Sequence, residues 1–478
     1  MNPTKKFLSI LLFLTTALLF RTDSAQAGPS GYEIRIKIEG LRDSLVHLAN
    51  YYGDKQYLKD SAYCDAQGQV VFKGDTALPG GIYLFVFPNK TYFELLIDKE
   101  QQFSMECQMD NVVPTMRIKN SEDNRLFYEY LRFIQEQSKQ VEPLRAQRRS
   151  LAEKNEKTDA VDAQIKVIDT RVADYKKKFS ADHPGTLLAA IFMASDEPQA
   201  PELPKKADGS PDSAFLYYYV RDHFFDQFDL ADERLLRTPV YHSKLNFYVK
   251  NMLIQIPDSL YGACDMLVKR AEGNKETFKY MVWFLTNYYE TANIMGLDAV
   301  FVHMVNNYYT KEKAYWVDDA TLYKIRDRAR ILGPILIGKK AKNLILQDST
   351  GTFQALHSIN SPITILYFWD PDCGHCKKAT PKVWAYYNRV KSKGVQVFAV
   401  CTEVEMDKWK KFIQEHTLDW INVCDPKLQN NFREDFDIKT TPQIFILDKD
   451  KKIIAKKIDE DNMEKIVDRE LEMLSGKK

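Results

Sequence analysis

Apolar and polar positions alternate in short runs over the first part of the chain. Period-two alternation of this kind is typical of strands that bury one face. Gly, Asp and Pro separate the runs, which are YEIRIKIEG, SLVHLANYY, GQVVFKG, GIYLFVF, TYFELLID and QFSMECQM. The pattern predicts a small antiparallel sandwich or barrel over residues 28–118, serving as a docking or spacer module because it shows nothing catalytic.

The apolar spacing then changes to steps of three and four residues, which predicts a helical domain over residues 119–335. Ser121 is placed to cap its first helix. One later stripe has heptad-like spacing and comprises Val161, Ile165, Ile168, Val172, Tyr175 and Phe179. Polar residues 154–159 precede it, so we expect a long helical hairpin whose stripe is a packing seam rather than a cofactor site.

Two further features organise this helical domain. Residues 197–213, EPQAPELPKKADGSPDS, are rich in proline and polar residues and predict a loop. From there to about Leu332, aromatic residues are dense and mostly at helical spacing. They predict helical core, with a substrate groove as the alternative.

Strand-like and helix-like segments alternate over residues 336–478. The predicted strands are SPITILYFW, VQVFAVCT, WINVCD, QIFILD and KIIAKKI. The predicted helices are CKKATPKVWAYYNRVKSKG, EMDKWKKFIQEH, KLQNNFREDF and NMEKIVDRELEML. This order predicts an α/β sandwich around a mixed sheet. The whole chain is therefore expected to be multidomain, with an antiparallel β domain, an α-helical region and a C-terminal α/β domain.

Length and charge agree with this division. A chain of 478 residues is too long for one ordinary core, and about three domains is the expectation. The 67 Lys+Arg residues balance 66 Asp+Glu residues, which gives no basic surplus for nucleic acid or an anionic membrane. The stretch Gly333–Lys340 nearly fits a phosphate-binding loop, but Lys340 stands where magnesium needs Ser or Thr, so nucleotide binding is rejected.

The amino terminus predicts export. Two lysines precede an apolar run over residues 7–20, and SAQA at residues 24–27 supplies small residues for cleavage near Ala27. Arg21 and Asp23 make the run too short for a membrane anchor, and no cysteine follows it for lipid attachment. We therefore expect a signal peptide over residues 1–27 and a periplasmic protein without a stable membrane anchor.

Seven cysteines are too few for a disulfide-stapled scaffold of this length. Cys64, Cys107 and Cys264 stand singly and are expected to be small buried residues. Cys401 and Cys424 end two predicted strands and could pair, although two buried thiols without a redox role are favoured.

The remaining two cysteines form the stretch Cys373-Gly374-His375-Cys376, where a strand passes into a helix. A helix N-terminus stabilises a thiolate, and a protonated His375 adds positive charge beside it. Cys376 lies one turn further along, where it can resolve a mixed disulfide formed by Cys373. The spacing therefore favours thiol-disulfide exchange.

This stretch and its surroundings resemble the thioredoxin superfamily, and more closely the exported TlpA/ResA-like thiol-disulfide oxidoreductases, from about Ile337 to the end. The matching residues are Phe368 and Trp369, the motif Cys373-Gly374-His375-Cys376, Lys377, Lys378, Pro381, Thr441 and Pro442. The resemblance implies that Pro381 kinks the active-site helix. It also implies that Pro442 is a cis-proline facing the thiols, where it blocks metal binding and helps Thr441 to hold a substrate backbone.

The sequence departs from the family pattern at two places. Tyr367 replaces the buried acidic residue of thioredoxins, and Ala379 replaces a glutamate of ResA-like reductases, so the proton acceptor for Cys376 is unassigned. Glu403 is a candidate, with a solvated strand end as the alternative. The inner Gly374-His375 pair is that of protein disulfide isomerases and implies a less reducing couple.

Other chemistries fit less well. A zinc site is not expected, because one C-x-x-C does not supply four ligands. Covalent haem attachment needs a histidine where Lys377 stands. A peroxiredoxin needs a threonine where Asp370 stands. We expect no metal and no cofactor. The leading hypothesis is a periplasmic disulfide reductase acting on disulfide-containing exported proteins, fed by an upstream thiol electron donor. The alternatives are an isomerase or oxidase with the same site, or a binding and assembly protein whose upstream domains do the main work.

Overall fold

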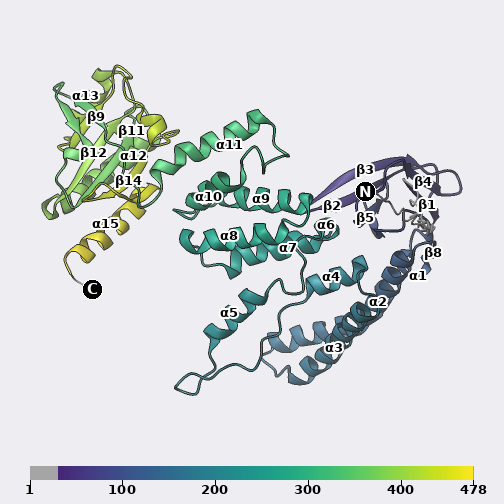
Figure 1. Ribbon diagram of the computed structural model, residues 1–478. Helices are drawn as coiled ribbons and strands as arrows, with labels where there is room; N and C mark the ends of the chain where they lie inside the picture. Colours follow the sequence, from purple (N-terminus) through teal and green to yellow (C-terminus); the bar gives the residue numbers. More distant parts are fainter. Residues whose placement is uncertain (1–30, 477–478) are drawn as a thin grey trace, which may run out of the picture. The chain divides into compact units, whose positions relative to one another are not determined.

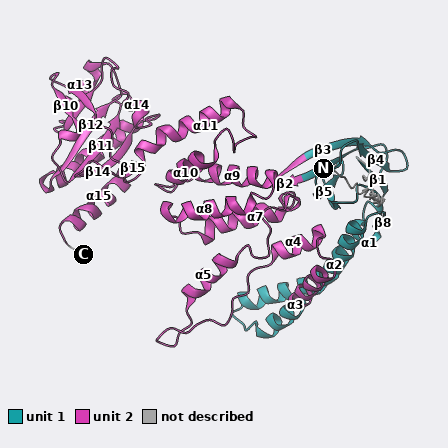
Figure 2. Ribbon diagram, in the orientation of Figure 1, with its two compact units in different colours: residues 1–50, 58–168 teal, residues 51–57, 169–478 magenta. Residues whose placement is uncertain are grey.

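The computed structural model describes residues 31–476, which divide into two compact units (Figures 1 and 2). Unit 1 contains the residues up to Asn50 together with Leu58–Ile168, and unit 2 contains Tyr51–Tyr57 and the chain from Asp169 onward. The predicted signal peptide, residues 1–27, lies outside the described residues. Within the described part of the chain, no helix combines the length and the apolar character needed to cross a membrane.

The amino-terminal β domain consists of two four-stranded sheets, with strand orders β4-β1-β7-β8 and β3-β2-β5-β6. Its elements are β1 (Tyr32–Glu39), β2 (Leu45–Tyr52), β3 (Lys55–Tyr63), β4 (Gln69–Gly74), β5 (Gly81–Val86), β6 (Tyr92–Ile97), β7 (Gln102–Gln108), α1 (Val112–Thr115) and β8 (Arg117–Lys119). Alternate residues Ile34, Ile36 and Ile38 of β1 are buried, as the period-two pattern predicts. The pairs are antiparallel except that β1 and β7 run parallel. The predicted β domain is confirmed.

The predicted helical hairpin is also present, formed by α2 (Glu122–Glu153) and α3 (Asp159–Asp182). Ser121 caps α2, since its side chain accepts a hydrogen bond from the backbone N–H of Asn124 at 3.3 Å. In the stripe on α3, Val161, Ile168 and Phe179 are buried, which agrees with a packing seam.

The helical part of unit 2 is built largely on aromatic side chains. Its elements are α4 (Leu187–Ser195), α5 (Ser213–His223), α6 (Glu233–Leu236), α7 (Pro239–Phe247), η1 (Tyr248–Met252), α8 (Pro257–Ala271), α9 (Lys275–Glu290), α10 (Asp298–Tyr308), α11 (Asp319–Leu332) and η2 (Gly333–Ile335). Tyr241 and Tyr289 are buried, and the ring of Tyr280 packs edge-on against Tyr52 with centroids 5.7 Å apart. The aromatic residues therefore form core, as predicted, and the chain between α4 and α5 is a loop.

The C-terminal domain is a seven-stranded mixed sheet in the order β10-β9-β13-β12-β11-β14-β15. Its strands are β9 (Ile345–Asp348), β10 (Phe353–Ala355), β11 (Ile363–Trp369), β12 (Val395–Cys401), β13 (Ile421–Cys424), β14 (Gln443–Asp448) and β15 (Ile453–Ile458). Its helical segments are η3 (Leu356–Ser358), α12 (Gly374–Val390), η4 (Lys391–Lys393), α13 (Met406–Glu415), α14 (Phe432–Asp435) and α15 (Glu460–Leu474). Every residue of β11 is buried between parallel β12 and antiparallel β14. This strand carries the chain to the start of α12. The predicted fold class is confirmed.

One predicted helix is much shorter than expected. The segment KLQNNFREDF forms only α14, four residues long. The Asp425 carboxylate accepts hydrogen bonds from the backbone N–H groups of Gln429 and Asn430, at 3.0 and 2.7 Å. Leu428, the residue before Gln429, has a positive φ of 52°. An aspartate that binds backbone donors in this way holds a turn in place of a helix.

Candidate functional site

The two motif cysteines lie at the first turn of α12 and differ in exposure. Cys373 is the N-cap residue and is half-buried, whereas Cys376 is completely buried. The turn before them is fixed by Asp370, whose backbone carbonyl accepts from the N–H of Cys373 at 3.2 Å and whose carboxylate accepts from the N–H of Asp372 at 2.8 Å. The strand-to-helix turn therefore presents one thiol to solvent and places the other beneath it.

The surroundings of Cys373 favour its thiolate. Burial raises the pKa of the Cys373 thiol, but hydrogen bonds to the sulfur, led by the backbone N–H of Cys376, lower it by more, so that the net pKa is below its ordinary value. Backbone donors at a helix N-terminus act in this way because they point at the sulfur and have no partner within the helix. Of the two motif thiols, Cys373 therefore has the environment that favours a reactive thiolate.

Cys376 has the opposite character. Burial raises the pKa of its thiol to about 12, and the neighbouring Cys373 adds to that rise. A thiol with such a pKa stays protonated at neutral pH and does not attack by itself. The Cys373 thiol is thus accessible from solvent, whereas the Cys376 thiol is buried.

The peptide bond between Thr441 and Pro442 is cis, and it brings a second segment to the thiols. The Cys373 thiol donates to the carbonyl oxygen of Thr441 at 3.3 Å, across 68 positions of the sequence. His375 is exposed and, like Pro442, lines a cleft beside the motif. Thr441, Pro442 and His375 therefore lie around Cys373.

The remaining predicted site residues differ in exposure, since Trp369 is buried and Gly374 and Pro381 are exposed. Trp369 is fully buried, with its ring 5.0 Å from that of Phe412. Pro381 lies inside α12. At Gly374 an added Cβ would meet no heavy atom within 4 Å. Trp369 thus supports the site from the core, whereas Pro381 is exposed.

The candidate proton acceptor Glu403, and Tyr367 at the position of the acidic residue of thioredoxins, have other hydrogen-bond partners. The hydroxyl of Tyr367 lies 2.9 Å from that of Thr380, and burial raises the pKa of the phenol, which therefore stays neutral. The carboxylate of Glu403 accepts from the N–H groups of Val404 and Glu405, at 2.6 and 3.1 Å, just before α13. Within residues 31–476, neither side chain forms a hydrogen bond with Cys376.

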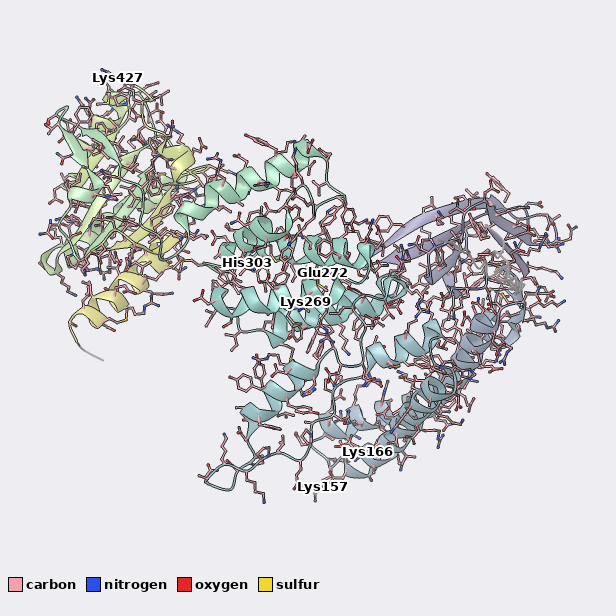
Figure 3. All side chains as sticks on the ribbon, viewed as in Figure 1. Lys157, Lys166, Lys269, Glu272, His303 and Lys427 are labelled. Atoms are coloured by element: carbon pink, nitrogen blue, oxygen red, sulfur yellow. The ribbon has the colours of Figure 1, made fainter. Side chains whose placement is uncertain are left out.

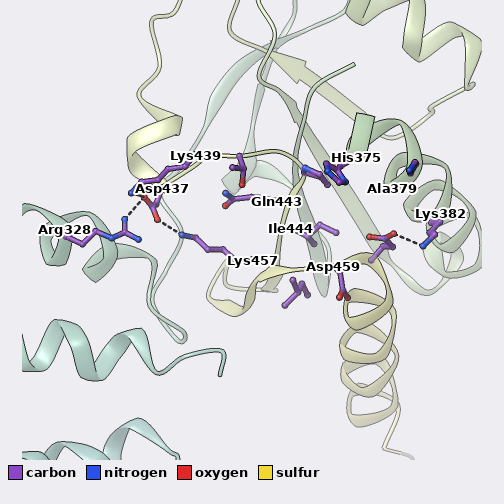
Figure 4. A pocket seen from close by; sticks show the side chains of 15 residues that line it. Arg328, His375, Ala379, Lys382, Asp437, Lys439, Gln443, Ile444, Lys457 and Asp459 are labelled. Atoms are coloured by element: carbon purple, nitrogen blue, oxygen red, sulfur yellow. Dashed lines mark hydrogen bonds and ion pairs between the residues drawn. The ribbon is translucent and has the colours of Figure 1, made fainter. Parts of the chain in front are cut away.

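A cleft of about 890 Å³ opens beside the motif, and it was not foreseen from the sequence (Figure 4). It runs from His375 and Pro442 to Arg328 of α11. There the Asp437 carboxylate accepts from Arg328 at 2.7 Å and pairs with Lys457. Because Arg328 and Asp437 are 109 positions apart, no local pattern could have indicated their contact.

The other cysteines of this domain are buried. Cys401 and Cys424 face each other in register on the parallel strands β12 and β13, and both are buried free thiols. Burial raises the pKa of Cys424 to about 11 and that of Cys401 still further. Cys64, Cys107 and Cys264 are buried as well, as predicted.

Comparisons with known proteins place the likeness mainly in the C-terminal domain. Residues 337–456 match the AhpC/TSA family, and residues 32–127 and 146–332 match two domains of unknown function, DUF4369 and DUF5106. Thiol-disulfide oxidoreductase ResA of Bacillus cereus is 27% identical over 130 residues, which cover 27% of this chain and 74% of that protein. A thioredoxin-like protein of Haemophilus influenzae is 30% identical over 122 residues, covering 24% of this chain and 67% of that one. Among solved structures, a domain of a possible thiol-disulfide isomerase from Cytophaga hutchinsonii is 40% identical with a TM-score of 0.28, covering 30% of this chain and 98% of that one.

Proposed function

Because this chain belongs to the thioredoxin superfamily and is a thiol-disulfide oxidoreductase, we propose that it is a reductase of disulfide bonds in exported proteins. The observation that carries the proposal is the asymmetry of the two thiols. Cys373 is half-buried with a lowered pKa, and Cys376 is buried with a pKa of about 12. An accessible nucleophile next to a protonated resolving thiol is the pair that reduction of a substrate disulfide requires.

The cycle begins with attack on the substrate. The Cys373 thiolate attacks one sulfur of the substrate disulfide, so that a mixed disulfide forms and the other substrate sulfur leaves as a thiolate. Cys376 then gives its proton to the substrate thiolate released in the first step and attacks the Cys373 sulfur, which forms the Cys373–Cys376 disulfide and expels the second substrate thiolate. Two electrons have passed to the substrate, and an upstream dithiol donor returns two electrons to restore the reduced pair.

Substrate positioning falls to the segment that contains the cis peptide bond. The carbonyl oxygen of Thr441 lies 3.3 Å from the Cys373 sulfur, so a polypeptide bound along Thr441 would bring its own disulfide to the attacking atom. The same hydrogen bond orients the Cys373 thiol before it loses its proton. The proposed compartment is the periplasm, and it rests on the sequence of residues 1–27.

A second candidate, isomerisation or oxidation with the same site, is favoured by one observation. The lowered pKa of Cys373 stabilises the reduced form of the pair, and a stabilised reduced form makes a disulfide more oxidising. The two directions differ in their need for Cys376. Isomerisation can proceed through attack and release by Cys373 alone, whereas net reduction needs the second thiol.

Insulin reduction by the full-length protein, driven by a dithiol donor, tests the proposal. Cys373→Ser should abolish turnover, and Cys376→Ser should accumulate a mixed disulfide that mass spectrometry detects. Cys424→Ala removes a buried thiol of the same domain and should keep full turnover. Insulin reduction that survives both motif substitutions would rule out the proposed site. Refolding of a scrambled disulfide protein by Cys376→Ser without insulin reduction would favour the isomerase instead.

A further inference from the structure

The cleft beside the motif has a basic wall that the redox step does not use. Five basic and three acidic side chains line it: Arg328, Lys378, Lys382, Lys439 and Lys457 against Asp437, Asp459 and Glu460. Figure 4 shows Arg328, Lys439 and Lys457 grouped around Asp437 at the end of the cleft away from Lys382. The cleft therefore has a surplus of positive charge, and that surplus is concentrated near α11.

The acidic partner of this group lies behind the cations. Asp437 is 3% exposed, whereas the side chains of Arg328 and Lys457 are 27% and 33% exposed and that of Lys439 is 68% exposed. One buried carboxylate is thus shared by three cations that still face solvent. A second negative charge entering the cleft would meet these exposed cations before it met Asp437.

The other two carboxylates that line the cleft already have hydrogen-bond or ion-pair partners. Asp459 caps α15, since its carboxylate accepts from the N–H of Asn462 at 2.8 Å. Glu460 pairs with Lys382 at 2.8 Å. Lys378 is exposed at the cleft and makes no ion pair within residues 31–476. These two carboxylates therefore do not neutralise the surplus of positive charge near α11.

Gln443 provides an independent sign of a missing ligand. Its side chain follows Pro442 directly, lines the cleft and is 8% exposed. Its Oε1 is buried and has no hydrogen-bond partner among the described residues. Buried polar atoms are almost always paired, and an unpaired acceptor calls for a donor. A backbone N–H of a bound polypeptide, next to the thiols, is such a donor.

We infer that this cleft binds an acidic segment of the substrate polypeptide adjacent to its disulfide. A substrate Asp or Glu pairs with Arg328 and Lys439, and a substrate backbone N–H donates to Oε1 of Gln443. The inference rests on the proposed function and adds a substrate preference to it. Since Arg328 belongs to α11, the helical domain supplies a specificity residue that the thioredoxin-like domain lacks by itself.

Reduction of two matched peptides by the full-length protein tests this inference. Each peptide carries one intramolecular disulfide, and they differ only in having Asp and Glu or Asn and Gln beside it. Wild-type protein should reduce the acidic peptide with a kcat/KM about tenfold higher at low salt, and the preference should shrink as salt screens the charges. Because attraction in the cleft acts on binding, most of the difference should lie in KM.

Single substitutions locate the preference. Arg328→Gln and Lys439→Gln should each reduce the ratio of the two kcat/KM values about threefold, by removing one of the cations. Arg328→Lys keeps the charge and should restore most of the ratio. Lys427→Gln removes an exposed charge of the same domain that does not line the cleft, and it should leave the ratio unchanged (Figure 3). Lys439→Gln serves as the test if Arg328→Gln folds poorly, because Lys439 is mostly exposed.

Reduction of the neutral compound hydroxyethyl disulfide distinguishes a failure of the proposed function from a failure of the acidic preference. If wild-type protein reduces neither this compound nor the peptides, the proposed function fails. If it reduces the compound and both peptides equally well, the function stands and the acidic preference is overturned. A preference that is unaffected by both Arg328→Gln and Lys439→Gln also overturns the inference, since recognition then lies elsewhere.

Discussion

Arg328 donates a hydrogen bond to the carboxylate of Asp437 at 2.7 Å, and this contact ties α11 to the loop that leads into Thr441 and Pro442. Asp437 also pairs with Lys457 and is almost completely buried. The residue that orients Cys373 is therefore four positions from an ion pair anchored in the helical domain. We therefore expect the stability of this ion pair and the geometry of the thiol site to be linked through the loop.

Replacing Asp437 by asparagine tests that link through stability. Asp437→Asn should lower the free energy of unfolding by about 2 kcal/mol at pH 7, because the cations lose charged hydrogen bonds but can still reach water. Burial raises the pKa of Asp437, and the bonds from Arg328 and Lys457 lower it by more, so the net pKa is lowered.

The sign of the pH dependence follows from that lowered pKa. The stabilisation is present above the unfolded pKa, about 3.9, and is lost as pH falls through the folded value. Urea unfolding should therefore show a difference between wild type and variant that shrinks toward pH 3. Asp419→Asn, at an exposed pair with Lys391, should cost less than about 1 kcal/mol. Equal costs for the two variants would contradict the account.

The lowered pKa of Cys373 predicts early alkylation as pH rises. Only the thiolate reacts, so iodoacetamide should modify Cys373 with a pH midpoint below the value of about 8.5 for an unperturbed cysteine. Cys376, with a pKa near 12 and no exposure, should react only after denaturation. Peptide mass spectrometry of timed samples distinguishes the two sites. Similar alkylation rates at Cys373 and Cys376 in the native protein would show that the two thiols do not differ in pKa and exposure as described.

The Tyr367 hydroxyl is predicted to be structural. Tyr367→Phe removes the 2.9 Å hydrogen bond to Thr380 and should cost about 1 kcal/mol of stability. Insulin reduction should stay within about twofold of wild type, because the phenol is neutral and is bonded to Thr380. A large fall in turnover with unchanged folding would instead make Tyr367 part of proton transfer.

The sequence predicts most elements of the fold because their burial follows a simple period. β1 alternates, β11 is a continuous apolar run, and Ser121 marks the start of α2. The missed strand β3 has no such signal, since its residues are mostly exposed and it is ordered as a neighbour of β2 in the sheet. Propensity and pattern are informative only where burial on one face fixes the residue type.

The candidate site likewise has a local part that the sequence predicts and a part, made by distant residues, that it does not. The C-x-x-C spacing and the strand-to-helix position of Cys373 are local, so the sequence predicts them. The approach of Thr441 to Cys373 depends on the pairing between β11 and β14, so only the family resemblance predicted it. The Arg328–Asp437 contact and the cleft have neither a local pattern nor a family motif, and they emerge only from the packed structure.

The reduction potential of the Cys373–Cys376 pair tests the central claim most directly. The full-length protein is equilibrated with defined ratios of reduced and oxidised glutathione or dithiothreitol, and the state of the two thiols is read by mass spectrometry. A reversible two-electron couple more negative than about −220 mV is the predicted result, since it lies on the reducing side of the isomerases. A couple near about −180 mV or higher, or no reversible couple at all, would contradict a disulfide reductase.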